Sequence, residues 1–125
     1  MIWMDAGAPS LGRRAVQILD QALADDALAV SAISFWEVAM LVNKGRLEMD
    51  FPPDVWRQEL ISRGLIELPI NGQTGIAAAN LQDFHGDPAD RIIVATTIST
   101  GSSLVTADGK ILNWDGLNQK INARN

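Results

Sequence analysis

The sequence predicts an α/β protein in which a parallel sheet is flanked by helices, and three observations support this prediction. First, segments typical of helices and of strands alternate along the chain. Second, residues 27–33 form an uninterrupted apolar run, which is typical of a strand covered on both faces of a parallel sheet. Third, the 125 residues contain no linker, repeat or low-complexity segment. We therefore expect a single domain over residues 1–125, large enough for one sizeable core.

Helices are expected where apolar residues recur at helical spacing between a capping residue and a stop signal. Ser10 is a good N-cap for the first helix, Ser34 for the second, and Asp87, followed by Pro88, for the last long one. The expected helices run from 11 to about 24, from 34 to about 44, from 52 to 64, from 72 to 81 and from 87 to 101, with a short helical turn or loop over 110–114.

Strands are expected between these helices. The segments 27–33, 65–70 and 103–107 have the apolar, β-branched composition of strands, and 117–121 is expected to be a last edge strand. The chain opens with a short apolar segment, residues 1–4, which leads into a loop over residues 5–9.

Composition excludes several classes of protein. The chain has no cysteine, so it has neither a disulfide framework nor a thiolate metal site, which fits a reducing compartment. No apolar run approaches the roughly 18 residues of a membrane span, and the first residues are not a secretory signal. We therefore expect a cytoplasmic protein with no membrane contact. With a net charge of −5, the chain needs a metal or a local basic patch to attract a phosphate.

Three carboxylates stand at predicted junctions between strands and helices: Glu37, Asp90 and Asp108. In a parallel sheet, functional groups gather beyond the carboxyl ends of the strands, so these side chains can share one crevice. Carboxylates packed closely repel one another unless a proton or a cation intervenes. Oxygen ligands select hard ions such as Mg²⁺ or Mn²⁺, which activate water and stabilise a leaving oxygen in phosphodiester cleavage.

Each carboxylate also has a structural explanation. Glu37 completes a capping box with Ser34, Asp90 stands in a first helical turn where the helix dipole favours a negative charge, and Asp108 precedes a glycine in a common turn pair. The case for a site therefore depends on all three together.

Other candidate residues have competing interpretations. His85 is the only histidine, which argues against a zinc site and favours a loop contact over a general base. Arg91 can orient a carboxylate, meet a phosphate or form a surface salt bridge. The tryptophans Trp36, Trp56 and Trp114 are interpreted as core or interface anchors rather than base-stacking platforms.

The segments VSAISFWEVA at 30–39, GRL at 45–47, FHGDPADRIIVAT at 84–96 and LVTAD at 104–108 agree in order and spacing with one family. Together they resemble the PIN-domain family, specifically the VapC-type toxins of bacterial toxin–antitoxin pairs. The resemblance implies a three-layer PIN-like fold and a metal-dependent endoribonuclease that cleaves RNA and is silenced by a cognate antitoxin. It also implies that Glu37, Asp90 and Asp108 hold Mg²⁺ or Mn²⁺, and that the protein is a homodimer.

Further residues are assigned roles around this centre. We expect Ser34, Asp87, Arg91 and Thr106 to contact the substrate or to support the ligands. We expect Trp36, Met40 and Leu41 to line a groove for an amphipathic antitoxin helix.

One departure from the family pattern bears on activity. The family opens with a strand that ends in Leu-Asp-Thr-His or similar, whereas Asp5 here is followed by Ala6 and Gly7. The sequence therefore predicts that the first, central strand is missing and that Asp5 does not replace its aspartate. The alternative function is a catalytically impaired, truncated PIN-domain protein that only binds antitoxin. A third hypothesis, a small nucleotide-binding module, ranks last because no glycine-rich phosphate loop follows a strand.

Overall fold

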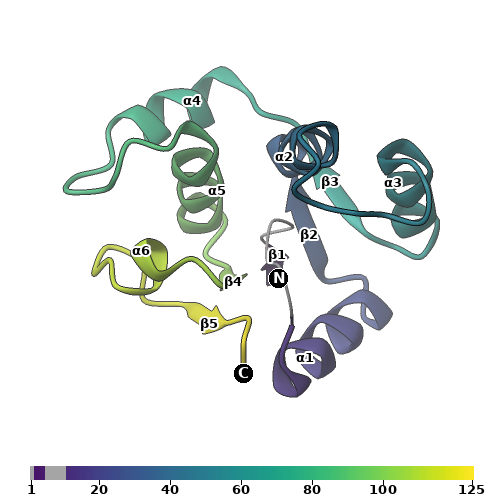
Figure 1. The fold of residues 1–125 in the computed structure, drawn as a ribbon. Helices are drawn as coiled ribbons and strands as arrows, with labels where there is room; N and C mark the ends of the chain where they lie inside the picture. Colours follow the sequence, from purple (N-terminus) through teal and green to yellow (C-terminus); the bar gives the residue numbers. More distant parts are fainter. Residues whose placement is uncertain (1, 5–10) are drawn as a thin grey trace.

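The computed structural model describes residues 2–4 and 11–125, which form a five-stranded parallel sheet between two layers of helices (Figure 1). The strand order is β3-β2-β1-β4-β5, and every neighbouring pair is parallel. The strands are β1 (Ile2–Met4), β2 (Leu28–Ser31), β3 (Ile66–Leu68), β4 (Ser103–Thr106) and β5 (Lys120–Asn122). This architecture confirms the predicted fold class.

The central strand that was expected to be missing is present, so that expectation was wrong. β1 pairs with β2 through Ile2 and Leu28 and with β4 through Trp3 and Leu104. Three residues are enough because β2 and β4 are themselves only four residues long. Their backbone donors and acceptors therefore find partners in β1.

Six helices connect the described strands, and their positions agree with the predicted ones to within a few residues. They are α1 (Arg13–Ala24), α2 (Ala32–Asn43), α3 (Pro53–Ser62), α4 (Gly72–Ala79), α5 (Pro88–Ser99) and α6 (Gly109–Leu112). Gly45 and Gly64 follow α2 and α3 with φ values of 70° and 110°, a conformation that glycine adopts without strain. Within residues 11–125, no helix has the length and apolar character needed to cross a bilayer.

Two predicted helix caps were wrong. Gly12, not Ser10, is the N-cap of α1, and Ser10 lies outside the described residues. Ser31, not Ser34, is the N-cap of α2, and its Oγ accepts a hydrogen bond from the Ile33 amide at 3.4 Å. The helix begins early because β2 ends at Ser31, without the further residues expected of the strand. Glu37 therefore lies in the second helical turn, where the capping-box explanation no longer applies.

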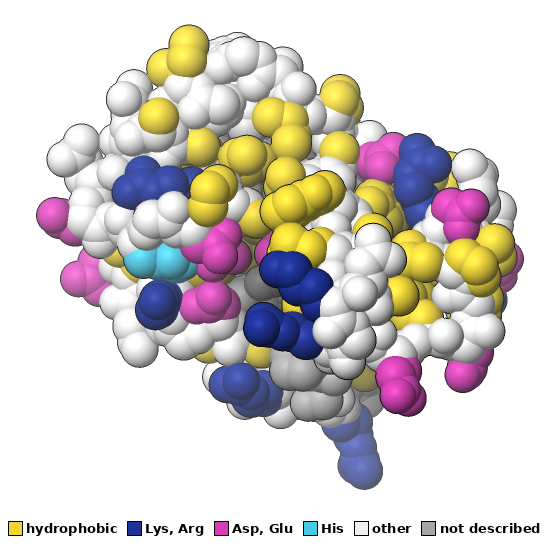
Figure 2. Space-filling view, turned by 45° about the horizontal axis from the view of Figure 1, so that its top comes forward, with side chains coloured by type: hydrophobic (Ala, Val, Ile, Leu, Met, Phe, Trp, Pro, Cys, Tyr) yellow, Lys and Arg dark blue, Asp and Glu magenta, His cyan; other side chains and the backbone are white. Residues whose placement is uncertain are grey.

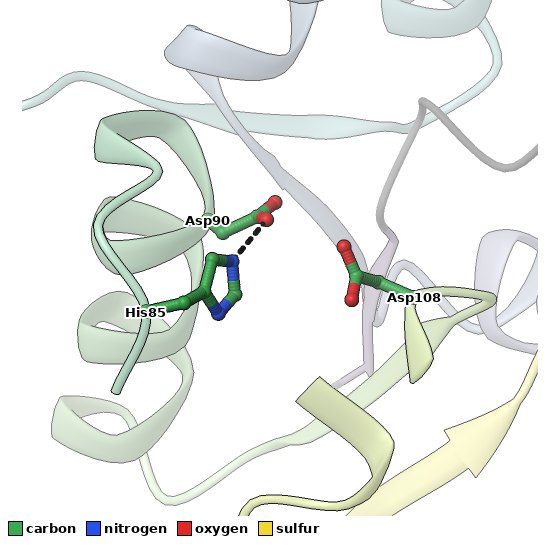
Figure 3. A group of neighbouring side chains, drawn as sticks. All are labelled: His85, Asp90 and Asp108. Carbon is green, nitrogen blue, oxygen red and sulfur yellow. Dashed lines mark hydrogen bonds and ion pairs between the residues drawn. The ribbon is translucent and has the colours of Figure 1, made fainter. Parts of the chain in front are cut away.

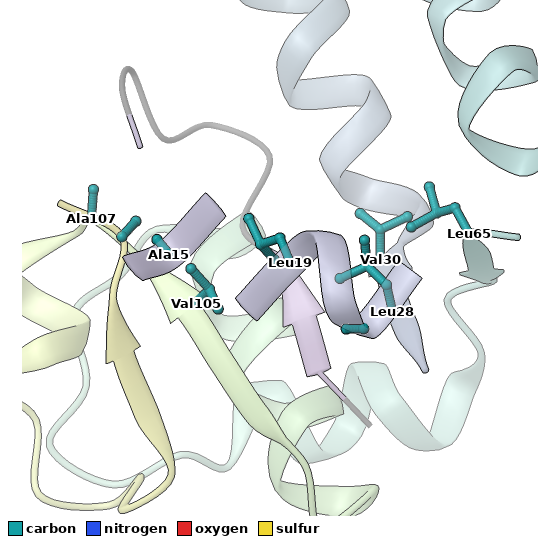
Figure 4. Close-up of a cluster of buried hydrophobic side chains, with 9 residues drawn as sticks. Ala15, Leu19, Leu28, Val30, Leu65, Val105 and Ala107 are labelled. Carbon is teal, nitrogen blue, oxygen red and sulfur yellow. The ribbon is translucent and has the colours of Figure 1, made fainter. Parts of the chain in front are cut away.

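The core consists of two clusters, one on each face of the sheet. Leu28 and Val30 of β2 point toward α1, whereas Ala29 between them joins the opposite cluster with Ile93 and Val94 of α5. This alternation follows from the two-residue side-chain period of a strand. Figure 4 shows Ala15 and Leu19 of α1 lying over the strands on the first face. The two clusters anchor α1 and α5 on opposite faces.

An ion pair attaches α3 to the edge strand β3. The Arg57 guanidinium donates to both carboxylate oxygens of Glu67, at 2.8 and 2.6 Å. These hydrogen bonds and the positive charge lower the pKa of Glu67 below its ordinary value. The pair therefore stabilises the fold only while Glu67 is ionised.

We predict that Glu67→Gln lowers the melting temperature by a few degrees at neutral pH. Because the pKa of Glu67 is lower in the folded than in the unfolded chain, the stabilisation is complete above the unfolded value and is lost as the pH falls through the folded one. The difference between the variant and the wild type should therefore shrink below about pH 4.3. Thermal melts over a range of pH measure this difference in melting temperature. Glu59→Gln, in the more exposed pair with Arg63, is the matched control and should have a smaller effect. A pH-independent difference would contradict this account.

Candidate metal centre

A cleft of about 910 Å³ opens at the carboxyl end of β4. The chain runs outward from β1 to β2 and β3 and then returns to place β4 on the other side of β1. In open parallel sheets, ligands bind in the crevice at such a reversal of strand order. The cleft lining includes four aspartates (Asp83, Asp87, Asp90 and Asp108) and the only histidine. Figure 2 shows this histidine beside acidic side chains, with lysine and arginine side chains nearby.

Three side chains converge in the cleft from three different segments. Asp90 comes from the first turn of α5, Asp108 from the turn after β4, and His85 from the loop before α5 (Figure 3). One potential ligand atom from each lies within 4.8 Å of the others. Ligand atoms on one octahedral ion with bonds of about 2.1 Å lie roughly 3–4 Å apart, so the carboxylates of Asp90 and Asp108 can share a divalent cation after a small contraction. The sequence correctly predicted that Asp90 and Asp108 meet.

The start of α5 places Asp90. Asp87 is the N-cap, as predicted, and its Oδ1 accepts a hydrogen bond from the Asp90 amide at 3.2 Å. Pro88 follows at the start of the helix, where its missing N–H costs nothing. Asp90 itself is only 7% exposed, so its carboxylate is directed into the protein rather than into solvent. Asp87 thus supports the site by fixing the helix end.

The turn after β4 places Asp108. The buried Thr106 hydroxyl accepts a hydrogen bond from the Asp108 amide at 3.1 Å. Asp108 Oδ1 in turn caps α6 by accepting from the amides of Lys110, at 2.8 Å, and Ile111, at 3.3 Å. Asp108 is therefore a helix cap, where a turn pair with Gly109 was expected, and the cap holds its carboxylate in one orientation.

His85 was undervalued by the sequence analysis. Its Nε2 lies 2.8 Å from Asp90 Oδ2, and the histidine side chain is 19% exposed. His85 lies five residues before Asp90, in a loop, and this spacing matches neither the helical nor the strand period, so the sequence does not predict the contact. Only the closure of the loop over the start of α5 brings the two together.

Arg91 contacts backbone carbonyls in the described structure, whereas a carboxylate, a phosphate or a surface salt bridge was expected; contact with a phosphate stays a prediction. Its guanidinium donates to the backbone carbonyls of His85 at 2.9 Å, Phe84 at 2.7 Å and Ala78 at 2.9 Å. It also lies 5.9 Å from the centre of the Phe84 ring. The planar guanidinium can serve several carbonyls at once, which an ammonium group does less well. Arg91 therefore organises the loop that carries His85 and does not pair with a carboxylate.

Glu37 does not belong to the cluster of His85, Asp90 and Asp108 in the described structure. It lines an adjoining pocket of about 350 Å³, and its Oε1 is shielded from solvent. Asp87 lines both this pocket and the larger cleft, so the two are contiguous. Ser34, one turn before Glu37 on α2, is fully buried, and its Oγ has no hydrogen-bond partner within the described residues. The site thus contains a second polar group beside Glu37.

The adjoining pocket is mostly apolar. Ile33, Trp36 and Met40 of α2 line one side, and Pro88 and Ala89 of α5 line the other. Trp36 is 57% exposed, so it is not a core anchor. Leu41, expected in the same groove, is half-buried and is not in the pocket lining.

Trp56 and Trp114 are both half-buried, and Trp114 packs against the core cluster that contains Phe84. Trp56 packs against Phe35 with ring centres 5.7 Å apart. Trp114 packs against Phe84 at 5.0 Å and donates from Nε1 to the Gln82 carbonyl at 3.0 Å. Trp114 thereby helps to hold the loop before α5.

Two cationic residues in the cleft lining escaped the sequence analysis. Lys110 follows Asp108 in α6, and Arg124 reaches the cleft from the segment after β5. Both are exposed. Neither stands in a basic run, so no charge pattern in the sequence marked them. Together they form a local basic patch beside the acidic cluster.

Comparisons with known proteins agree with this architecture. The PIN domain family model matches residues 3–117. Ribonuclease VapC22 of Mycobacterium tuberculosis (strain ATCC 25618 / H37Rv) is 37% identical over 111 residues, which cover 87% of this chain and 82% of that protein.

Solved structures show the same fold at lower identity. A toxin–antitoxin complex from Klebsiella pneumoniae matches with a TM-score of 0.61 and 18% identity over 98% of both chains. FitAB bound to an IR36 DNA fragment matches with a TM-score of 0.60 and 20% identity, over 90% of this chain and 89% of that one. FitAcB from Neisseria gonorrhoeae matches with a TM-score of 0.59 and 20% identity, over 88% of this chain and 89% of that one.

We predict that Arg91→Met lowers the free energy of unfolding by about 1–3 kcal/mol, because carbonyls in a partly buried loop lose their charged donor. Denaturant unfolding measures the change. Arg63→Met is the matched control, because Arg63 is exposed and pairs with Glu59 within the same helix; its effect should be much smaller. Equal effects of the two substitutions would contradict the anchoring role of Arg91.

Proposed function

The chain belongs to the PIN-domain family, and we propose that it is a metal-dependent endoribonuclease that acts as the toxin of a toxin–antitoxin pair. The observation that carries this proposal is the convergence of Asp90 and Asp108 in one cleft at the carboxyl edge of the parallel sheet. The likeness to a VapC ribonuclease supports RNA as the substrate.

In this proposal Asp90, Asp108 and Glu37 hold Mg²⁺ or Mn²⁺. When bound, such an ion lowers the pKa of a water molecule and stabilises the leaving oxygen of a phosphodiester. Asp90 and Asp108 are already oriented by the starts of α5 and α6, so little reorganisation is needed to receive the cation. Glu37 approaches from the adjoining pocket, on the other side of Asp87.

We also propose Asp5 as a further ligand. The sequence analysis set it aside because Ala6 and Gly7 follow it and because the central strand was expected to be missing, but that strand is Ile2–Met4. Asp5 is the next residue in the sequence, although it lies outside the described residues. An aspartate that follows the central strand is, by chain order alone, a candidate for the same edge as Asp108.

The cations of the cleft provide contacts for the substrate. A protein with a net charge of −5 does not attract RNA by its overall field. Lys110 and Arg124 lie beside the aspartates, where they can bind the phosphates that flank the scissile one. They supply the local basic patch that the sequence analysis required.

The apolar pocket beside Glu37 suits a protein partner. Trp36 and Met40 offer apolar surface next to the cleft, and this is the place where we propose that a cognate antitoxin helix docks. An occupant there would also restrict access to Glu37. Toxin–antitoxin assembly among the structural neighbours supports this partner class. The proposal that the toxin forms a homodimer rests on the family resemblance.

The alternative, an impaired protein that only binds antitoxin, has less support than the enzyme. It depended on a missing central strand, and β1 occupies that position. Asp90 and Asp108 are both in place, so nothing in the described cleft requires a loss of activity.

We predict that Asp90→Asn and Asp108→Asn each reduce divalent-dependent RNA cleavage by at least about 100-fold, because each removes a charged ligand. Asp5→Asn should have a comparable effect if Asp5 completes the site. Cleavage of a defined RNA in Mg²⁺, in Mn²⁺ and in chelator measures this.

Asp83→Asn is the matched control for these variants. Asp83 lines the same cleft, and its φ of 56° is a conformation that asparagine tolerates. It should keep wild-type cleavage. Retained activity in Asp90→Asn would refute the metal centre, whereas retained activity in Asp5→Asn alone would remove only that ligand.

We predict that Lys110→Gln and Arg124→Gln weaken binding of single-stranded RNA and flatten its salt dependence. Each lost phosphate contact should reduce the slope of log K against log[salt] by about 0.7. Binding is measured by anisotropy on the inactive Asp90→Asn chain across a salt series. Lys44→Gln, an exposed lysine at the end of α2, should leave the slope unchanged. A slope that changes equally in the Lys44 variant would contradict a local phosphate site.

A further inference from the structure

We propose that His85 is a positioning residue of the metal centre: its imidazole holds the carboxylate of Asp90 in the orientation that receives the cation, and Arg91 holds His85. This inference rests on the proposed metal-dependent function. It assigns roles to two residues that contact neither the ion nor the RNA.

The first step is the contact between the two side chains. His85 Nε2 lies 2.8 Å from Asp90 Oδ2, within hydrogen-bond distance, and both side chains are largely buried, at 19% and 11% exposed. A carboxylate turns readily about its last bond, so a buried hydrogen bond to one oxygen restricts which direction the group presents. Partners of this kind orient metal ligands in many sites.

The second step is the rigidity of the loop that carries His85. Arg91 donates to the carbonyls of Phe84 and His85 and ties both to the Ala78 carbonyl at the end of α4. The Phe84 ring also contacts Trp114, which donates to the Gln82 carbonyl. These contacts together hold the loop and keep the backbone of His85 beside the start of α5.

The third step separates a positioning role from direct coordination. A ring nitrogen that donates a proton to a carboxylate has no lone pair to offer a cation at the same time. Nε2 is the ring nitrogen in contact with Asp90. The geometry therefore favours a chain of contacts from Arg91 through the loop and His85 to Asp90, with the carboxylate as the ligand.

The experiment compares Mn²⁺ binding by the full chain and its His85→Leu and His85→Gln variants, using calorimetry. Leucine fills similar space without a polar group, and glutamine keeps a donor close to the position of Nε2. His85→Leu should weaken Mn²⁺ binding by about 10–100-fold, and His85→Gln should restore most of it. Thermal melts of each variant confirm that the fold is retained.

A double-mutant cycle tests whether His85 acts through Asp90. In the Asp90→Asn chain, adding His85→Leu should produce no further loss of Mn²⁺ affinity, because the group that it positions is no longer a charged ligand. A general loss of structure would instead add to the first effect. Additive losses would overturn the proposed chain of contacts.

Two other results would overturn the inference while leaving the metal centre intact. One is unchanged Mn²⁺ affinity in His85→Leu alongside a loss in Asp90→Asn. The other is a nitrogen coupling to bound Mn²⁺ in pulsed electron paramagnetic resonance that disappears in His85→Gln, which would make His85 a direct ligand. Unchanged affinity in Asp90→Asn would refute the proposed centre itself, so the two failures are distinguishable.

Discussion

The parallel pairing of β1 with both β2 and β4 is the constraint on which the rest of this structure depends. It places a three-residue strand at the centre of the sheet and makes the strand order reverse at that point. Because all the strands run in one direction, their carboxyl ends share an edge, and α5 and α6 both begin near it. The sheet and the positions of these two helix starts are therefore enough to bring Asp90 and Asp108 together.

The helix starts serve structure and chemistry with the same atoms. Asp87 caps α5 and positions Asp90, while Asp108 caps α6 with the same carboxylate that we propose as a ligand. A capping role therefore does not argue against a functional one at either position. Around them, Arg91 uses its charge on backbone carbonyls rather than on a carboxylate. The hydrogen bonds of this guanidinium thus organise the loop that carries His85.

The balance of charge around the cleft also explains how an acidic protein can act on RNA. Four aspartates line it, and two of them, Asp90 and Asp108, lie close enough for a cation to relieve the repulsion between their charges. Lys110 and Arg124 lie on the same lining and supply the positive potential that the protein as a whole lacks. The apolar pocket next to Glu37 places a hydrophobic surface directly beside this polar centre, so that substrate and protein partner would meet at adjoining sites.

The sequence by itself determined the fold class, most element positions and the pairing of Asp90 with Asp108, because these depend on periodicity, capping residues and chain order. Other features emerged only in the tertiary structure. The strand Ile2–Met4 is too short to show a pattern, and only its two partners make it central. Ser31 and Ser34 are equally good caps in sequence, and the end of β2 selects Ser31. The contacts of Arg91 reach residues six, seven and 13 positions away, and His85 meets Asp90 through a loop closure. The residues in these contacts are not separated by a helical or strand repeat, so sequence periodicity cannot predict them.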